Sequence, residues 1–205
     1  MTQIRDTAGR WPVTGSQVDV RGRIVTLRTD SVQMPDGEIA VREVIEHPGA
    51  VAIVALDEDE RVLMIRQYRH PAAATLWELP AGLRDVEGEP LLQTARRELL
   101  EEAGWQARDW RILADAFTSP GISTERLRIF LARDLTVVPE ADRGYVPEHE
   151  EAYLTVDWVP LAEAVRLALC GHLHNGVTIL GILSAHAAKG EGFGALRPPE
   201  DPETL

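Results

Sequence analysis

The chain has 205 residues, a length that fits one domain large enough to close a hydrophobic core. Apolar residues make up 44% of the sequence and charged residues 26%, which excludes a disordered or collagen-like chain. The 33 acidic and 21 basic residues give a net charge of −12, which argues against nonspecific binding to nucleic acids. An anionic substrate would therefore need arginines or divalent cations around it.

The sequence has one cysteine, Cys170, which excludes an intrachain disulfide as well as zinc-ribbon and CxxC redox patterns. No apolar run approaches the roughly 18 residues of a membrane-spanning helix. The first residues also lack the apolar core of a signal peptide. These features predict a cytoplasmic protein that has no membrane partner.

The two ends of the chain differ in composition from the rest. Residues 1–15 and 190–205 are rich in glycine, proline and charge, which leaves too little apolar surface to offset the entropy of ordering. We therefore expect flexible tails on both sides of a single domain that spans residues 16–189.

Strands are expected in the first third of the domain. Residues 17–28 and 31–47 are rich in valine and isoleucine, and the Pro-Asp-Gly sequence at 35–37 predicts a turn, and so a hairpin. Residues 50–56 and 61–68 predict a second hairpin with a charged turn. This early sheet is expected to be mostly antiparallel.

The first helix is predicted over residues 90–103, because Pro90 stands at its start and Gly104 just past its end. Further strands are predicted at 110–117, 127–135 and 153–159, and further helices at 161–170 and 177–188. This mixture predicts an α+β fold. The sequence has no internal repeat and no glycine-rich phosphate loop of the dinucleotide or P-loop type.

Three glutamates on the first helix carry the predicted chemistry. Glu98, Glu101 and Glu102 are spaced i, i+3 and i+4, so their carboxylates share one flank of the helix. Their repulsion costs a few tenths of a kcal/mol per pair, which a bound divalent cation with oxygen ligands would offset. The alternative is a solvated acidic face with Arg96 and Arg97 as partners.

The segment from Gly82 to Trp105 decides between these alternatives because it resembles the Nudix box, commonly written G-x5-E-x7-R-E-U-x-E-E-x-G-U, where U is aliphatic. Two positions depart from that pattern: Gly82 lies seven residues before Glu89 instead of six, and Trp105 replaces the final aliphatic residue. The matching residues are Gly82, Glu89, Arg97, Glu98, Leu99, Glu101, Glu102 and Gly104.

The resemblance implies the Nudix fold, an α/β/α sandwich with a mixed central sheet, here with an additional N-terminal antiparallel sheet. It implies that Glu98, Glu101 and Glu102 hold Mg²⁺, with Mn²⁺ as a substitute, together with the backbone carbonyl of Ala81. Arg97 would orient the carboxylates, so Arg97, Glu98 and Glu102 are expected to be catalytic. The resemblance assigns structural roles to Gly82, Glu89 and Gly104.

The stretch from Ile65 to Gly82 resembles the branch of this family that hydrolyses ADP-ribose and other ADP-sugars. That branch typically carries a proline about 16 residues beyond the box, which matches Pro120 and places Gly121 beside it. Arg66 and Arg69 would then contact phosphate or the distal ribose through their forked donors.

Three further residues in this stretch have open roles. Tyr68 and Trp77 would flank the nucleotide base of the substrate, with ordinary core packing as the alternative for each. Glu78 would pair with an arginine, accept a hydrogen bond from the substrate or contribute near the metals. Arg69 itself is hard to bury without an anion.

Hydrolysis also needs a general base that metal does not occupy. Residues 141–153 form a polar stretch that predicts a long loop, and in the ADP-ribose branch the corresponding loop supplies a catalytic glutamate. We expect Glu151 to be this base, with Glu150 and Glu148 as rivals. A merely solvated acidic loop is the alternative.

Together these features predict an enzyme that hydrolyses ADP-ribose to AMP and ribose 5-phosphate. The same chemistry would also serve ADP-glucose, GDP-mannose, NADH or dinucleoside polyphosphates, and a non-catalytic nucleotide sensor is the alternative from another class. The expected partner is a small nucleotide-sugar substrate and not a nucleic acid. The resemblance also implies a homodimer, with strands 16–47 in the interface.

Overall fold

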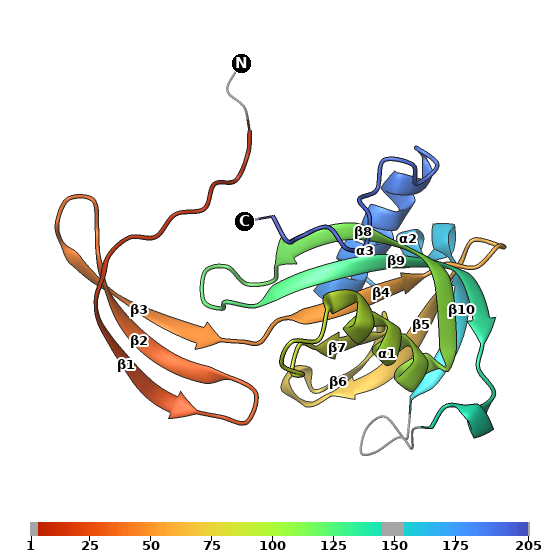
Figure 1. Ribbon diagram of the computed structural model, residues 1–205, viewed down its shortest axis with the longest axis horizontal. Helices are drawn as coiled ribbons and strands as arrows, with labels where there is room; N and C mark the ends of the chain where they lie inside the picture. The colour runs from red at the N-terminus through yellow and green to blue at the C-terminus, as the bar shows by residue number, and fades with distance from the viewer. Residues whose placement is uncertain (1–3, 145–153, 205) are drawn as a thin grey trace. The chain divides into compact units, whose positions relative to one another are not determined.

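The computed structural model describes residues 4–144 and 154–204 (Figure 1). The chain divides into two compact units where the sequence suggested one domain. One unit consists of Met1–Gly49, Phe117–Arg126 and Pro202–Leu205, and the other of Ala50–Ala116 and Leu127–Asp201. No helix among the described residues is long and apolar enough to cross a membrane.

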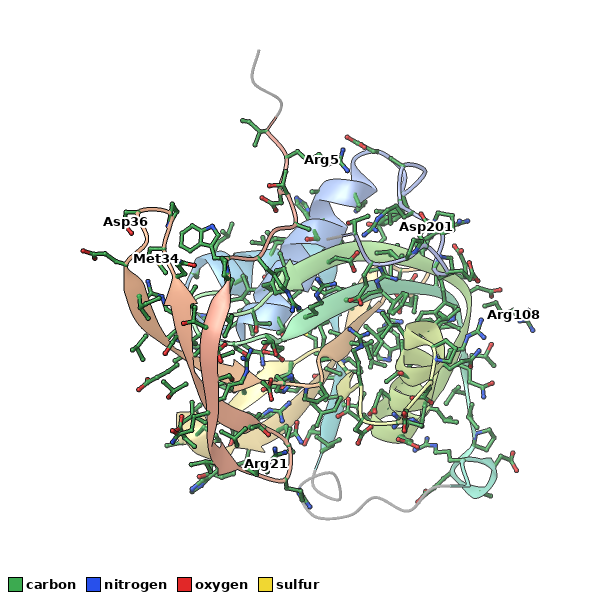
Figure 2. The ribbon with its side chains drawn as sticks, turned by 60° about the vertical axis from the view of Figure 1, so that its left-hand side comes forward. Arg5, Arg21, Met34, Asp36, Arg108 and Asp201 are labelled. Carbon is green, nitrogen blue, oxygen red and sulfur yellow. The ribbon has the colours of Figure 1, made fainter. Side chains whose placement is uncertain are left out.

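The first unit is built on an antiparallel sheet of three strands in the order β1-β2-β3. The strands are β1 (Val13–Arg21), β2 (Thr26–Gln33) and β3 (Ile39–Glu46). Met34 and Asp36 lie at the turn between β2 and β3, at the opposite end of the sheet from Arg21 (Figure 2). The predicted hairpin around residues 35–37 is therefore confirmed.

The stretch over residues 17–28 is strand-like, as expected from its valines and isoleucines, but a turn divides it between β1 and β2. The N–H of Gly22 donates to the carbonyl of Val25 at 2.9 Å and closes the turn. A Cβ at Gly22 would lie 2.9 Å from the carbonyl oxygen of Val25, so the close approach favours glycine. The valine-rich composition reflects two paired strands and does not mark the turn.

The second unit contains two sheets and three helices. One sheet has the strand order β7-β4-β9-β8 and the other has the order β10-β5-β6. The strands are β4 (Ala50–Ala55), β5 (Arg61–Arg69), β6 (Ala74–Glu78), β7 (Ala81–Leu83), β8 (Trp105–Phe117), β9 (Arg126–Val137) and β10 (Thr155–Pro160). The helices are α1 (Leu91–Ala103), α2 (Leu161–Leu169) and α3 (Gly176–Lys189), with short 3₁₀ turns η1 (His70–Ala72) and η2 (Glu140–Asp142).

Strand β4 lies between two hydrophobic cores. Ala52 and Val54 belong to one core, which also contains residues of α2 and α3. Val51 and Ile53 belong to the other, which contains the buried side of α1. Since alternate residues of a strand point to opposite faces, β4 is covered on both sides. This layering, and the parallel β4–β9 and antiparallel β4–β7 pairings, confirm the predicted α/β/α sandwich with a mixed sheet.

The prediction of a hairpin between residues 50–56 and 61–68 is wrong. The first stretch becomes β4 and the second becomes β5, and these strands lie in different sheets. An isolated bridge between Leu56 and Val62 links them at the turn. The buried middle of each stretch is apolar, but β4 pairs with β7 and β9 while β5 pairs with β6 and β10.

Residues that follow α3 also differ from the flexible tail that composition suggested. Arg128 on β9 is 3% exposed and binds both carboxylate oxygens of Asp115 on β8 at 2.7 and 2.9 Å. Arg197 donates to the same carboxylate at 2.7 Å, and Arg128 donates to the carbonyl of Asp201, also at 2.7 Å. The C-terminal segment therefore completes a partly buried charge cluster, which explains why it is held against the unit.

Asp115→Asn should destabilise the protein by about 3 kcal/mol, because it leaves the buried guanidinium of Arg128 without a counter-charge. Urea unfolding measures this loss. The matched control is Glu163→Gln, which removes the charge from an ion pair on the surface of α2. Glu163 and Arg166 lie 2.6 Å apart there, and the side chain of Arg166 is 55% exposed. That control should cost well under about 1 kcal/mol. Equal losses in the two variants would contradict a structural role for the Asp115 cluster.

Candidate active site

Helix α1 presents one apolar and one acidic side. Its buried residues include Leu92, Ala95 and Leu99, which pack against the core beside β4. The helix begins after Pro90 and ends at Gly104, whose φ of 72° is left-handed and whose N–H caps the last turn. Both ends therefore lie where the sequence predicted them, and the flank with Glu98, Glu101 and Glu102 is held in place by the packing of the apolar side.

Glu98 lies directly against the backbone of β7. A Cβ built at Gly82 would come within 2.0 Å of the Glu98 Cδ and 2.1 Å of its Oε1. Any side chain at position 82 would therefore push the carboxylate away. Gly82 pairs with Val51 of β4, which fixes this backbone within the sheet. The glycine is needed here for close approach, since its φ is not positive.

Burial sets the charge state of Glu98. Its side chain is 13% exposed, and this burial raises the pKa of Glu98 to about 7. Arg97 acts in the opposite direction, while the nearby charge of Glu101 adds to the increase. Glu98 is therefore a carboxyl group that changes charge near neutral pH in the protein without bound cations.

Glu102 is tied to the same strand by a different contact. Its Oε2 accepts a hydrogen bond of 2.8 Å from the backbone N–H of Ala81. The structure thus brings Ala81 to the acidic flank of α1, but through its N–H. The role of its carbonyl as a metal ligand stays a prediction.

Arg97 connects the carboxylates of the helix with the loop before it. Its Nη1 donates to Glu98 at 2.7 Å and to Glu101 at 3.0 Å. Its Nη2 donates to Glu89 at 3.3 Å, and the hydroxyl of Thr94 donates to the same Glu89 oxygen at 2.9 Å. Burial alone would raise the pKa of Glu89, but the bonds from Arg97 and Thr94 hold it below its usual value.

The three carboxylates do not yet converge on one point. Glu98 and Glu101 bind Arg97, whereas Glu102 binds the N–H of Ala81. Across residues 4–144 and 154–204, no three His, Cys, Asp or Glu side chains are grouped so that they could hold an ion as they stand.

Arg69 and Glu78 form a pair that the sequence left open. Glu78 is 2% exposed, and it accepts three hydrogen bonds of 2.6 to 3.1 Å from Arg69. Glu78 therefore supplies Arg69 with an anionic partner among the described residues. The arginine remains 43% exposed, so it is fixed in position without being buried.

The other residues expected around the substrate have different surroundings. Trp77 packs against the core of α2 and α3, in agreement with the core-packing alternative. Arg66 is exposed on β5, opposite Trp77 in the register. Tyr68 is 47% exposed, and its hydroxyl oxygen lies 3.3 Å from the Nδ1 of His70.

Two groups of predicted residues lie outside the described part of the unit that contains α1. Pro120 and Gly121 are exposed residues of the first unit. Glu148, Glu150 and Glu151 lie outside the described residues.

Sequence reasoning missed two residues next to Arg97. Thr94 binds Glu89, and Asp85 lies 4.0 Å from the guanidinium. Thr94 precedes Arg97 by three residues, so the helical period places both on one side of α1. This spacing could have identified Thr94 from the sequence. Asp85 lies in the loop before the helix, where no periodicity applies.

Comparisons with known proteins agree with this geometry. The family model for the NUDIX domain matches residues 46–177, and the model for the nucleoside diphosphate sugar hydrolase N-terminal domain matches residues 11–45. The chain is 50% identical over 179 residues to an ADP-ribose pyrophosphatase of Mycobacterium tuberculosis, which covers 86% of this chain and 83% of that protein. An ADP-ribose pyrophosphatase of Bacillus subtilis is 33% identical over 161 residues, or 78% and 84% of the two chains.

A solved structure described as an ADP compounds hydrolase has a similar fold. Its TM-score is 0.74 at 24% sequence identity, and the match covers 92% of this chain and 99% of that one. At this identity the likeness concerns the fold, which agrees with the layers described above.

Glu98→Gln should stabilise the protein without bound cations, and the gain should grow with pH. The unfolded chain ionises this group from about pH 4.5, whereas the folded protein keeps its proton until about pH 7. The wild type therefore loses stability relative to the glutamine variant across that interval, by at most about 3 kcal/mol, and no further above it. Urea unfolding with a chelator, at about pH 5 and about pH 8, measures the difference. A difference that does not depend on pH would show that Glu98 titrates normally.

Proposed function

The chain belongs to the NUDIX family, and we propose that it hydrolyses the pyrophosphate of ADP-ribose to AMP and ribose 5-phosphate. The observation that carries this choice of substrate is the 50% identity to an ADP-ribose pyrophosphatase over 86% of the chain. The acidic flank of α1, set against the backbone of β7, supports the chemistry.

A divalent cation fits the residues of this flank. Glu98, Glu101, Glu102 and the carbonyl of Ala81 would hold it, because hard cations such as Mg²⁺ or Mn²⁺ take oxygen ligands. When bound, such a cation neutralises pyrophosphate charge and polarises the attacking water. We propose Mg²⁺ as the cofactor and Mn²⁺ as a substitute. Arg97 limits the mutual repulsion of Glu98 and Glu101 by donating a hydrogen bond to each carboxylate.

The remaining roles follow from the chemistry of the side chains. A water molecule attacks phosphorus, the anhydride bond to the leaving phosphate breaks, and a base takes the proton of the water. We assign this base to Glu151, with Glu150 and Glu148 as alternatives. We also assign contacts with the substrate to Arg66, Tyr68, Arg69, Glu78, Pro120 and Gly121. Arg69 suits this role because Glu78 fixes its guanidinium while part of it stays exposed.

A homodimer is the assembly that we propose, with strands 16–47 in its interface. Large apolar side chains of the first unit are exposed in the single chain, among them Val18 at 41%, Val20 at 58% and Val41 at 62%. Contiguous exposed apolar surface commonly marks an interface between proteins. We also propose a cytoplasmic location, which suits the free and exposed thiol of Cys170.

An assay with Mg²⁺ should show preferential release of AMP and ribose 5-phosphate from ADP-ribose. ADP-glucose, GDP-mannose, NADH and diadenosine tetraphosphate, offered at equal concentration, are the competitors, and chromatography resolves the products. A preference for one of these would keep the chemistry but change the substrate. Binding of nucleotide without any cleavage would support a sensor.

Glu98→Gln and Gly82→Ala should each lower kcat by about a hundredfold or more, because both remove the Glu98 carboxylate from its place. The added methyl group of Gly82→Ala would overlap with Glu98 at 2.0 Å. Circular dichroism should show that both variants remain folded. Gly176→Ala at the start of α3 is a matched control for the backbone change, since nothing lies within 4 Å of its Cβ position. Full activity in Gly82→Ala would contradict the placement of Glu98.

Light scattering after size-exclusion chromatography should give the mass of a dimer. Val18→Lys together with Val20→Lys should shift the protein to the monomer, because buried lysines without partners oppose association. A monomeric wild type would contradict the proposed interface.

A further inference from the structure

Three residues join the C-terminal end of α1 to the end of β9, and we call them the Gly104 clasp: Gly104, Val138 and Arg143. The backbone N–H of Val138 donates to the carbonyl of Gly104 at 2.9 Å. The Nε of Arg143 donates to the carbonyl of Val138 at 3.0 Å. The clasp thus links a helix end, a strand end and the residue that follows η2.

The guanidinium of Arg143 lies directly over the α-carbon of Gly104. A Cβ built at Gly104 would come within 2.3 Å of the Arg143 Cζ, 2.4 Å of its Nη2 and 2.7 Å of its Nε. These three atoms belong to the planar guanidinium of Arg143, so the flat face of the guanidinium covers Gly104. Gly104 itself is buried. The glycine therefore serves two needs, a left-handed φ of 72° at the helix end and a seat for this side chain.

The charge of Arg143 suits this place. The last carbonyls of an α-helix carry partial negative charge, and a cation beside them stabilises the helix end by about 0.3 to 1 kcal/mol. The last turn of α1 contains no basic residue of its own. Arg143 supplies a positive charge from another part of the chain instead.

The clasp matters for the site because of where it lies on α1. Glu101 and Glu102 belong to the last turn of the helix, three and two residues before Gly104. The other end of this flank is fixed by the packing of Glu98 on Gly82. Without the clasp, the last turn would keep its apolar packing, the bond from Ala81 to Glu102 and the bond from Arg97 to Glu101, but it would lose its link to the end of β9. Helix ends fray when their contacts are removed.

We propose that Arg143 is a positioning residue for the hydrolytic reaction, which holds Glu101 and Glu102 in place through its seat on Gly104. This inference rests on the proposed function of the acidic flank. Arg143 is not assigned a contact with substrate or cation. It acts through the end of α1, where a displacement of about 1 Å can cost up to a hundredfold in rate.

Arg143→Ala should lower kcat about tenfold at saturating Mg²⁺ and leave KM for ADP-ribose within about twofold. It should also weaken Mn²⁺ binding to the substrate-free protein several-fold, as measured by electron paramagnetic resonance. A merely structural residue would lower the unfolding midpoint and leave both quantities unchanged in the folded fraction. Arg143→Lys should stay impaired, because an ammonium has charge but no flat face.

A double-mutant cycle tests whether the two residues act together. Gly104→Ala should reduce Mn²⁺ affinity strongly in the wild type, since the methyl group displaces the guanidinium and strains the backbone. In the Arg143→Ala background the same change should have a smaller effect, because only the strain remains. Arg108→Ala is the matched control, since Arg108 extends from β8 into solvent and its side chain is 80% exposed (Figure 2).

Equal effects of Gly104→Ala in both backgrounds, or wild-type kcat and Mn²⁺ affinity in Arg143→Ala, would overturn the inference. Full recovery in Arg143→Lys would also overturn it, since charge alone would then suffice. If the wild type binds Mn²⁺ but does not cleave ADP-ribose, the choice of substrate fails. The Mn²⁺ measurements would then still decide whether Arg143 positions the carboxylates.

Discussion

The site depends on the absence of one side chain, because the carboxylate of Glu98 occupies the space where a Cβ at Gly82 would be. This contact joins α1 to β7, and β7 is in turn paired with β4. Since β4 is buried on both faces, it cannot shift without disturbing both cores. The position of one charged group is thus fixed by the packing of the whole sandwich. Burial at the same contact raises the pKa of Glu98, so position and charge state have one cause.

Charge balance around α1 follows from this packing. Glu98, Glu101 and Glu89 all bind Arg97, so one guanidinium offsets several carboxylates in a protein with a net charge of −12. Repulsion along the helix would otherwise oppose its formation. Arg97 therefore offsets part of the negative charge that gathers on this flank.

Local features of the fold could be predicted from the sequence, whereas long-range pairings could not. Pro90 and Gly104 mark the ends of α1 through their own backbone preferences, and the helical period places Glu98, Glu101 and Glu102 on one flank. The partners of β4 and β5 are set by tertiary packing, which an apolar run does not encode. The pairing of Arg69 with Glu78 likewise depends on the β5–β6 register. The position of Arg143 over Gly104 depends on a contact between segments that are far apart in the sequence. The composition of the C-terminal segment does not reveal that Arg197 binds the half-buried carboxylate of Asp115.

The structure accommodates both departures from the box pattern, the extra residue before Glu89 and the tryptophan at position 105. The extra residue lies between Gly82 and Glu89, in the loop before α1, and Gly88 adopts a left-handed φ of 78° there. Glu89 still reaches Arg97 and Thr94, so the length of this loop is less constrained than the spacing along the helix. Trp105 packs edge-on against Trp158 with their ring centres 5.2 Å apart, and both join the core that contains α1. The larger residue is accommodated because an aromatic partner on β10 packs beside it.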